Sequence, residues 1–405
     1  MDRKVLVLIL ATIFLDGVGI GIVFPIMPDL MTRVGALSVT EGAFWGGLLM
    51  SAYAAMQFLF GPVVGGISDA FGRRPVLLVA LAALAIDYVI MALADTLTLL
   101  MVGRILAGIA GATYITATAC LADISPPHKR AANFGLIGGT FGLAFVLGPA
   151  LGGLTATIDI SAPFWIAGGI AAVNFAFAFF LLPESLPVER RRAFGRRDLN
   201  PFGAILAAFR MPGLALPLVL IFVFEFANMV YPVIWSFWTR ELLGWSAALI
   251  GLSLAVYGGG VALTQGGVMR VLLPRLGESR VLLLGMVTGA IASLGFGMTG
   301  VAWAVFAFLP LAALSDMVPP TMTAIMANQV DEDRQGVLQG VIASLASIAA
   351  ITAPVVMTAV FQGFTGANAP VYLPGAPFLL AGVLMAATLP FTLRLMRAAP
   401  PPSAR

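Results

Sequence analysis

The side chains that most often perform enzyme chemistry are scarce in this sequence. Among 405 residues there is one cysteine, Cys120, and one histidine, His128, and only 10% are Asp, Glu, Lys or Arg. A single cysteine excludes an internal disulfide and a cysteine-built metal site, and we interpret His128 as an ordinary loop residue. No nucleophile, base and orienting group occur together, and no phosphate-binding glycine loop is present. The sequence therefore argues against an enzyme, a metal site and a bound cofactor.

Long polar stretches are also missing, and apolar ones take their place. Sixty per cent of the residues are hydrophobic and the mean hydropathy is +1.01, which excludes an ordinary soluble globule. A membrane span needs about 20 apolar residues. The apolar runs are continuous, whereas the strands of a membrane β-barrel alternate apolar and polar residues. We predict an all-α membrane protein with twelve transmembrane helices, near residues 5–30, 42–67, 75–95, 97–121, 132–156, 163–182, 213–238, 247–272, 280–299, 302–326, 335–362 and 376–396.

Positive charge is distributed unevenly over the predicted loops. Nineteen of the 22 Lys and Arg residues fall on one side of the twelve-helix arrangement, Arg33 and Arg240 fall on the other, and Arg104 lies inside a span. By the positive-inside rule both termini are cytoplasmic, and we expect a multi-pass protein of the cell (inner) membrane. The first span is too long for a removable signal peptide. The cations are scattered over loops, so we expect no nucleic-acid partner.

The longest interruption in hydrophobicity, from residue 183 to residue 212, divides the chain in two. Six spans precede it and six follow, which predicts two pseudo-symmetric six-helix bundles, 1–182 and 213–398, joined by a cytoplasmic linker, 183–212, and followed by a disordered tail, 399–405. The basic run Arg190-Arg191-Arg192 and Arg196-Arg197 in the linker is expected to face lipid headgroups. We expect a monomer.

One polar turn, between the second and third spans, combines charge with glycine. It contains Gly65, Asp69, Gly72, Arg73 and Arg74. Glycines there allow close approach of helices and a sharp turn, and the arginines keep the turn on the cytoplasmic side.

Four carboxylates lie inside predicted spans, where ionisable groups are costly and indicate function: Asp16, Asp87, Glu225 and Asp316. Arg104 is the one cation predicted inside a span, and a pair between Asp16 and Arg104 would offset part of both desolvation penalties. A carboxyl group in a low-dielectric cavity favours its neutral form, so it can bind and release a proton as its exposure changes. The alternative is that these acids only tie helices together through hydrogen bonds.

Other polar and aromatic residues on spans suit the wall of a cavity. They are Gln57, Asn228, Tyr231, Trp235, Tyr257 and Gln265, while Trp238 suits a membrane interface equally well. A cavity with few polar groups fits an amphiphilic organic molecule better than a sugar.

The whole chain resembles the major facilitator superfamily, and within it the twelve-helix drug and proton antiporters of the tetracycline efflux type. The turn from Gly65 to Arg74 resembles the superfamily signature in which the acid and arginines form a cytoplasmic gate. The run Asp87-Tyr88 through Gly103-Arg104 to Thr113 resembles the tetracycline efflux signature, whose arginine is implicated in proton coupling. Gly148, Pro149, Gly152 and Gly153 resemble the antiporter motif of the fifth helix.

This resemblance implies a secondary transporter that uses the proton gradient, not ATP, to export a lipophilic drug by alternating access. The sequence departs from the pattern at four positions. Ala70 replaces a basic residue and Ala144 replaces a glycine, while Val261 stands in place of a histidine and Gly289 in place of an aspartate. The last two departures put tetracycline itself in doubt as the substrate. Proton-coupled import of a metabolite, and movement of a lipid or lysolipid, are the alternative functions.

Overall fold

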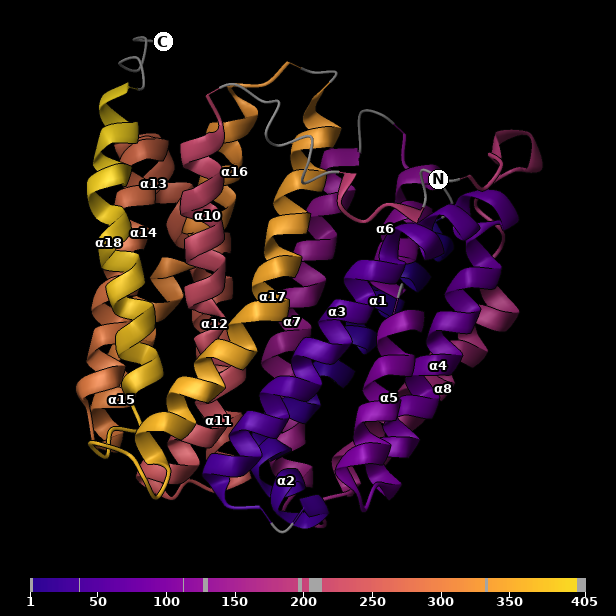
Figure 1. The fold of residues 1–405 in the computed structure, drawn as a ribbon. Coiled ribbons are helices and arrows are strands. Elements are labelled where there is room, and N and C mark those ends of the chain that lie inside the picture. The colour runs from indigo at the N-terminus through magenta and orange to yellow at the C-terminus, as the bar shows by residue number, and fades with distance from the viewer. Residues whose placement is uncertain are drawn as a thin grey trace. The chain divides into compact units, whose positions relative to one another are not determined.

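The computed structural model describes residues 3–35, 37–111, 113–126, 130–195, 199–203, 213–331 and 334–398. His128, the tail 399–405 and parts of the linker (196–198 and 204–212) lie outside these ranges. The described residues form helices joined by short turns (Figure 1). They contain twelve helical segments long and apolar enough to cross a membrane, which confirms the predicted all-α fold with twelve spans.

Two compact units make up the chain, Met1–Pro201 with Trp245–Ala255, and Phe202–Gly244 with Val256–Arg405. The bundle boundaries predicted at residues 182 and 213 stay a prediction. The helices of the first unit are α1 (Arg3–Val23), η1 (Phe24–Ile26), α2 (Met27–Gly35), α3 (Val39–Phe71), α4 (Arg73–Leu93), α5 (Leu97–Ala110), α6 (Thr113–Ile124), α7 (Arg130–Thr155), α8 (Ala162–Leu181) and η3 (Val188–Arg190). Those that follow are α10 (Ala215–Asn228), α11 (Val230–Leu243), α12 (Ala247–Leu263), η5 (Thr264–Val268), α13 (Met269–Leu276), α14 (Glu278–Met298), α15 (Ala302–Ser315), α16 (Val318–Ala327), α17 (Gln335–Thr365) and α18 (Ala376–Ala398), the division between the units falling within α12.

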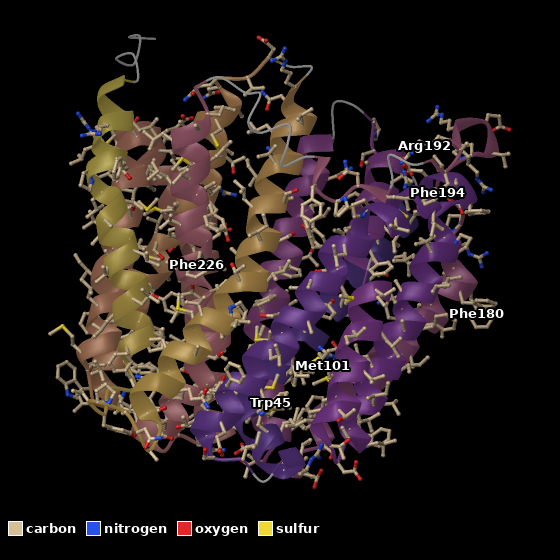
Figure 2. All side chains as sticks on the ribbon, in the orientation of Figure 1. Trp45, Met101, Phe180, Arg192, Phe194 and Phe226 are labelled. Atoms are coloured by element: carbon tan, nitrogen blue, oxygen red, sulfur yellow. The ribbon has the colours of Figure 1, made fainter. Side chains whose placement is uncertain are left out.

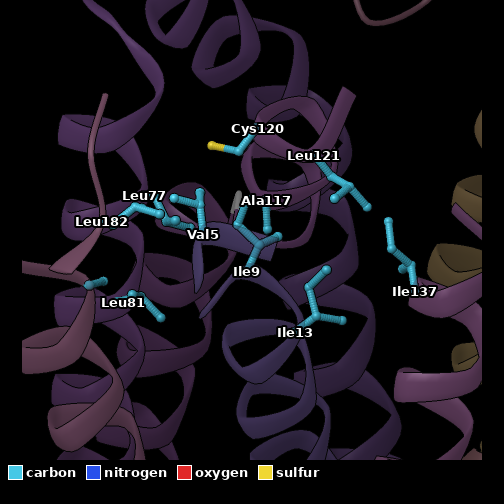
Figure 3. Packing of buried hydrophobic residues seen from close by; sticks show 11 residues of the cluster. Val5, Ile9, Ile13, Leu77, Leu81, Ala117, Cys120, Leu121, Ile137 and Leu182 are labelled. Atoms are coloured by element: carbon cyan, nitrogen blue, oxygen red, sulfur yellow. The ribbon is translucent and has the colours of Figure 1, made fainter. Parts of the chain in front are cut away.

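Helix α1 is central to the packing of the first unit. Val5, Ile9 and Ile13, spaced four residues apart, lie on one face of α1 and are buried. Figure 3 shows this face directed at side chains from neighbouring helices, which include Leu77 of α4 and Ala117 of α6. Large apolar side chains also lie on the outer surface, as Phe180 of α8 does with 79% of its surface exposed (Figure 2). An exposed surface of this kind is expected where lipid surrounds the protein.

Several spans are built from two helices, and proline explains two of the breaks. Asn228 ends α10 and Asp316 follows α15, and each lies four residues before a proline, Pro232 or Pro320. Since proline has no N–H, the carbonyl groups of Asn228 and Asp316 lack their usual helical donor. Both breaks therefore place a polar residue, with its backbone oxygen released from the helix, inside a span.

Candidate functional site

A cavity of about 350 Å³ lies within the first unit. Its wall is mainly apolar and aromatic, with Asp16 as its one carboxylate among the lining residues Asp16, Ile20, Tyr53, Gln57, Ala80, Leu84, Ala107, Gly111, Tyr114 and Phe141. These residues come from the helices α1, α3, α4, α6 and α7 and from α5 with its C-terminal glycine. The cavity thus contains two residues predicted for the site, Asp16 and Gln57.

Asp16 is 9% exposed and, in the described part of the chain, forms no hydrogen bond and no ion pair. The residue after it, Gly17, faces α7, where a Cβ added to Gly17 would lie 2.8 Å from the Cβ of Ala144. The alanine found where the antiporter motif has glycine is therefore accommodated by the glycine opposite. Close packing of α1 on α7 fixes Asp16 at the cavity wall.

The predicted pair between Asp16 and Arg104 is wrong, because Arg104 forms an ion pair with Asp87. Helices α4 and α5 are consecutive and joined by a short turn, so residues at similar distances from the turn lie side by side. Asp87 is eight residues before Asp95 and Arg104 is nine residues after it. Gly103 has no side chain to obstruct this approach, since a Cβ there would lie 3.0 Å from Oδ1 of Asp87.

Arg104 also reaches toward the cavity wall. Its guanidinium carbon lies 5.5 Å from the ring centre of Tyr53, a cation–π distance, and Tyr53 lines the cavity. Gln57 donates from Nε2 to the carbonyl oxygen of Gly111 at 2.8 Å, which satisfies the C-terminal end of α5. No basic side chain lines the cavity among the described residues.

The second unit brings Asp316 together with three of the predicted cavity residues. The hydroxyl of Tyr257 donates to Oδ2 of Asp316 at 2.6 Å, and Nδ2 of Asn228 lies 3.5 Å from Oδ1. Gln265, in the π-helical turn η5, has its Nε2 3.5 Å from the backbone oxygen that Pro320 leaves without a helical donor. Oδ1 of Asn228 is buried without a hydrogen-bond partner in the described structure.

Glu225 lies three residues before Asn228 and interacts electrostatically with Asp316. Neither acid forms an ion pair with Lys or Arg within the described ranges, in contrast to Asp87 of the first unit. Asn228, Tyr257 and Gln265, predicted for a cavity wall, thus cluster around Asp316, predicted as an intramembrane acid, with Glu225 beside them.

Tyr231 and Trp235 occupy a closed aromatic cluster instead of an accessible wall. Both are buried, the ring centres of Tyr231 and Tyr257 are 5.3 Å apart, and Trp235 packs edge-on to Phe296 at 5.1 Å. Trp238 belongs to the same cluster and is also buried, so it is not an interface residue. Depth along a span can be read from the sequence, but the direction of a side chain cannot.

The polar turn between α3 and α4 contains a chain of charges. Asp69 forms an ion pair with Arg73, whose Nε lies 3.1 Å from Oδ2 of Asp123 at the end of α6. Nη2 of Arg74 donates to the carbonyl of Phe179 at 2.6 Å. Gly72, with φ of 110°, makes the sharp turn that the sequence predicts. Gly65, by contrast, has no atom within 4 Å of an added Cβ, so the close helix approach predicted there is not found.

The antiporter motif of α7 packs against two helices. A Cβ on Gly148 would lie 2.9 Å from Cα of Gly21 in α1, and one on Gly152 would collide with the carbonyl of Ile22. On the other side, α7 packs against α12. A Cβ on Gly153 would collide with the carbonyl of Ala247, and a Cβ on Gly251 of α12 would collide with the carbonyl of Pro149. Small residues let the backbones touch, which is typical of helices packed in lipid.

Known proteins resemble the chain over almost its whole length. A sequence profile of the Major Facilitator Superfamily matches residues 9–354 and, in a second match, residues 218–404. Tetracycline resistance protein, class C, of Escherichia coli is 37% identical over 89% of this chain and 90% of its own. The class G protein of Vibrio anguillarum is 34% identical over 92% and 95%.

Solved structures show the same fold. The human organic anion transporter MFSD10 (TETRAN) aligns with a TM-score of 0.71 and 25% identity, covering 96% of this chain and 99% of its own. A mutant of the nucleoside transporter NupG aligns with a TM-score of 0.79 and 12% identity over the same shares, which shows the fold alone.

Twelve apolar spans, buried charges and transporter relatives define a multi-pass membrane transporter. The chain belongs to the major facilitator superfamily and is homologous to the tetracycline resistance proteins, as the signature residues predicted.

Proposed function

We propose that the chain is a proton-coupled exporter of a lipophilic small organic molecule and that it works by alternating access. One observation carries the proposal. Asp16, a buried carboxyl group without a hydrogen-bond or ion-pair partner in the described structure, lies in the wall of a cavity in a chain homologous to tetracycline resistance proteins. Both termini are taken to face the cytoplasm, with the proton gradient across the cell membrane as the energy source.

The chemistry of Asp16 supports a proton as its ligand. An unpaired carboxylate in a low-dielectric wall is costly, so the group takes up a proton when the cavity closes and releases it when water enters. Asp87 has its charge neutralised by Arg104 and lacks this property. We therefore assign proton carriage to Asp16, and to Asp87 and Arg104 the task of fixing α4 against α5 beside the cavity.

The lining of the cavity supports the substrate class. A volume of about 350 Å³ is within the range of small-molecule sites, roughly 300–1,000 Å³. Apolar and aromatic side chains dominate, few hydrogen-bonding groups are available for a sugar, and no described lining residue offers an organic anion a positive charge. A neutral or cationic amphiphile fits this wall best.

The second unit supplies further negative charge. Glu225 and Asp316 are each without a Lys or Arg partner in the described structure, and their neighbours are uncharged donors such as Tyr257 and Asn228. We assign to this cluster a second proton or the counter-charge for a cationic drug. The ion pairs of Asp69 and Arg73, with Arg74 beside them, hold the cytoplasmic side closed in the outward-facing state.

Proton flux tests the proposal. The purified protein is placed in liposomes with an imposed pH gradient and exposed to tetracycline with Mg²⁺, chloramphenicol, a fluoroquinolone, a cationic dye, a lysolipid and an organic anion. The reference protein is compared with Asp16→Asn and with Asp95→Asn, whose acid is exposed in the turn between α4 and α5. We expect one of the drugs to collapse the gradient with the reference and with Asp95→Asn, and not with Asp16→Asn.

A measurement of drug binding separates the two roles proposed for the cavity, which are to bind the drug and to carry the proton. Asp16→Asn is expected to bind the drug nearly as well as the reference protein, because only the proton is lost. Full proton flux in this variant would remove Asp16 from the mechanism. A response to the lysolipid alone, or uptake of a metabolite in place of drug export, would overturn the proposed export function.

A further inference from the structure

The start of the linker lies across the end of the first unit where α3 meets α4. We call residues 183–192 the strap; they follow α8 and include the helical turn Val188–Arg190. Figure 2 labels Arg192 at the far end of this segment. We expected the basic run of the linker to face lipid headgroups. In the structure, however, Arg192 forms an ion pair with Asp69.

Apolar anchors and a helix cap fix the first half of the strap. Leu182, just before it, and Leu186 are buried. Glu184 accepts hydrogen bonds from the backbone N–H groups of Arg73 at 2.9 Å and Arg74 at 3.2 Å. These N–H groups belong to the first turn of α4 and have no partner within the helix. A residue more than a hundred positions away therefore supplies the cap of α4.

The far half of the strap is held by Asp69. Nε of Arg192 lies 2.7 Å from Oδ2 of Asp69, and the backbone N–H of Arg192 donates to the carbonyl of Asp69 at 3.2 Å. The side chain of Arg192 is 51% exposed, so this attachment is weaker than the buried leucines and is sensitive to salt.

The strap contacts both ends of the charge chain in the turn. At one end, Arg192 adds a cation to Asp69, which also forms an ion pair with Arg73. At the other end, Arg73 forms an ion pair with Asp123, and Asp123 accepts a hydrogen bond from the hydroxyl of Ser185 at 3.3 Å. Charges thus alternate from Arg192 through Asp69 and Arg73 to Asp123, and the strap closes the chain at both ends. These contacts at both ends of the charge chain are not required for a linker that only joins two bundles, so they indicate a further role for the strap.

We propose that Arg192 is a positioning residue of the turn between α3 and α4, and that the strap forms part of the gate. Glu184 and the leucines anchor the strap permanently, whereas the exposed ion pair of Arg192 with Asp69 opens and closes. The assignment of the turn as a gate rests on the proposed function; the positioning itself does not.

Hydrogen–deuterium exchange of the full-length protein in lipid nanodiscs tests this positioning without any substrate. The variants are Arg192→Ala, the conservative Arg192→Lys, and Arg190→Ala as matched control, because the exposed side chain of Arg190 has no hydrogen bond or ion pair in the described structure. We expect amides of residues 66–76 to exchange about two- to fivefold faster in Arg192→Ala, as loss of an exposed ion pair implies. Arg192→Lys should recover most of the protection, and Arg190→Ala should match the reference.

Salt provides a second readout that a general loss of folding would not reproduce. Raising the salt concentration from about 0.05 M to about 1 M shortens the screening length from more than 10 Å to about 3 Å. Exchange of the turn should then accelerate more in the reference protein and in Arg190→Ala than in Arg192→Ala, which keeps only the less exposed ion pairs of Arg73. At low salt, exchange in Arg192→Ala no faster than in the reference protein, or exchange in Arg190→Ala as fast as in Arg192→Ala, would overturn the proposal. Since the exchange experiment needs no drug, a negative result for the positioning role of Arg192 is distinct from a negative result with the drug panel.

Discussion

At the scale of single residues, two buried acids of the same unit differ in their partners. Asp87 forms an ion pair with Arg104, whereas Asp16 has neither a hydrogen bond nor an ion pair in the described structure. In a membrane, a paired acid can remain charged through a transport cycle, but an unpaired one is stable only while it is protonated or wet. Partnership, more than depth in the span, therefore separates the acid that we assign a structural role from the acid that we propose as the proton carrier.

The pair of Asp87 with Arg104 is testable by a double-mutant cycle. Arg104→Gln alone leaves a buried carboxylate without its cation, and removing one partner of a buried pair costs about 3–5 kcal/mol. We expect a large fall in the thermal stability of the solubilised protein for Arg104→Gln, and recovery of most of it in Asp87→Asn/Arg104→Gln. Stability is measured by size-exclusion chromatography after heating. Additive losses in the double variant would contradict the pairing.

Gly72 is the residue on which the turn between α3 and α4 depends. Its φ of 110° strains any residue with a Cβ, and that Cβ would collide with the carboxylate of Glu184, which caps α4. We expect Gly72→Ala to cost about 1–3 kcal/mol and to lower the melting temperature. Gly195→Ala is the control, because nothing lies within 4 Å of its added Cβ and its φ is outside the left-handed region. Equal melting temperatures for the two variants would show that the turn tolerates a side chain.

At the scale of helices, the crossing of α1 and α7 fixes Asp16 in place. Gly148→Val would push a branched side chain into the carbonyl of Val18 and the backbone of Gly21. Overpacking of this kind costs about 1–3 kcal/mol or more, and we expect transport to be lost. The matched control is Gly169→Val on α8, which is exposed and has no atom within 4 Å of an added Cβ. The two variants are compared by drug-driven proton flux at equal protein content, and full flux in Gly148→Val would contradict the crossing.

The break between α15 and α16 is also testable. Pro320→Ala supplies an N–H that can bond to the carbonyl of Asp316, which straightens the span and competes with Gln265. We expect slower hydrogen exchange around residues 316–320 together with a several-fold loss of transport. Pro310→Ala, within α15, is expected to slow exchange locally while transport persists. If transport also persisted in Pro320→Ala, the break would have no part in the mechanism.

The elements show what the sequence reveals and what it does not. Twelve apolar runs predict twelve spans because burial in lipid depends on composition over a length. The partner of Arg104 was predicted wrongly, although the nearly equal distances of residues 87 and 104 from the turn at Asp95 are a signal that the sequence contains. The positions of Pro232 and Pro320 likewise indicate the two breaks.

Other features have no local signal. The caps that Glu184 makes on α4 and the pairing of Arg192 with Asp69 join residues more than a hundred positions apart. Trp235 and Tyr231 were expected at a cavity wall, yet they are buried in an aromatic cluster. The direction of a side chain around a helix in an apolar span depends on tertiary packing, which the composition of that span does not encode.

At the scale of the whole molecule, the proposed function makes an ion gradient the energy source of transport. We expect drug export from proteoliposomes to proceed on a pH gradient without ATP and to stop when nigericin, a proton–potassium exchanger, dissipates that gradient. Export that persists with nigericin but requires a sodium gradient would replace the proton by Na⁺ as the coupling ion. Carboxylates in general are ligands for either ion.

The strap connects the turn between α3 and α4 to the segment that continues toward α10, and a reversible cross-link can show whether it moves during transport. Asp69→Cys/Arg192→Cys places thiols on two backbones that already touch, since the N–H of Arg192 donates to the carbonyl of Asp69 at 3.2 Å, in a chain whose one natural cysteine, Cys120, is buried. We expect oxidation to stop drug-driven proton flux and a reductant to restore it, because a covalent bond cannot open with the gate. Each single-cysteine variant serves as control and should respond to neither reagent. Undiminished flux in the fully cross-linked protein would mean that Arg192 stays on Asp69 throughout the cycle, so that the strap supports the turn without opening.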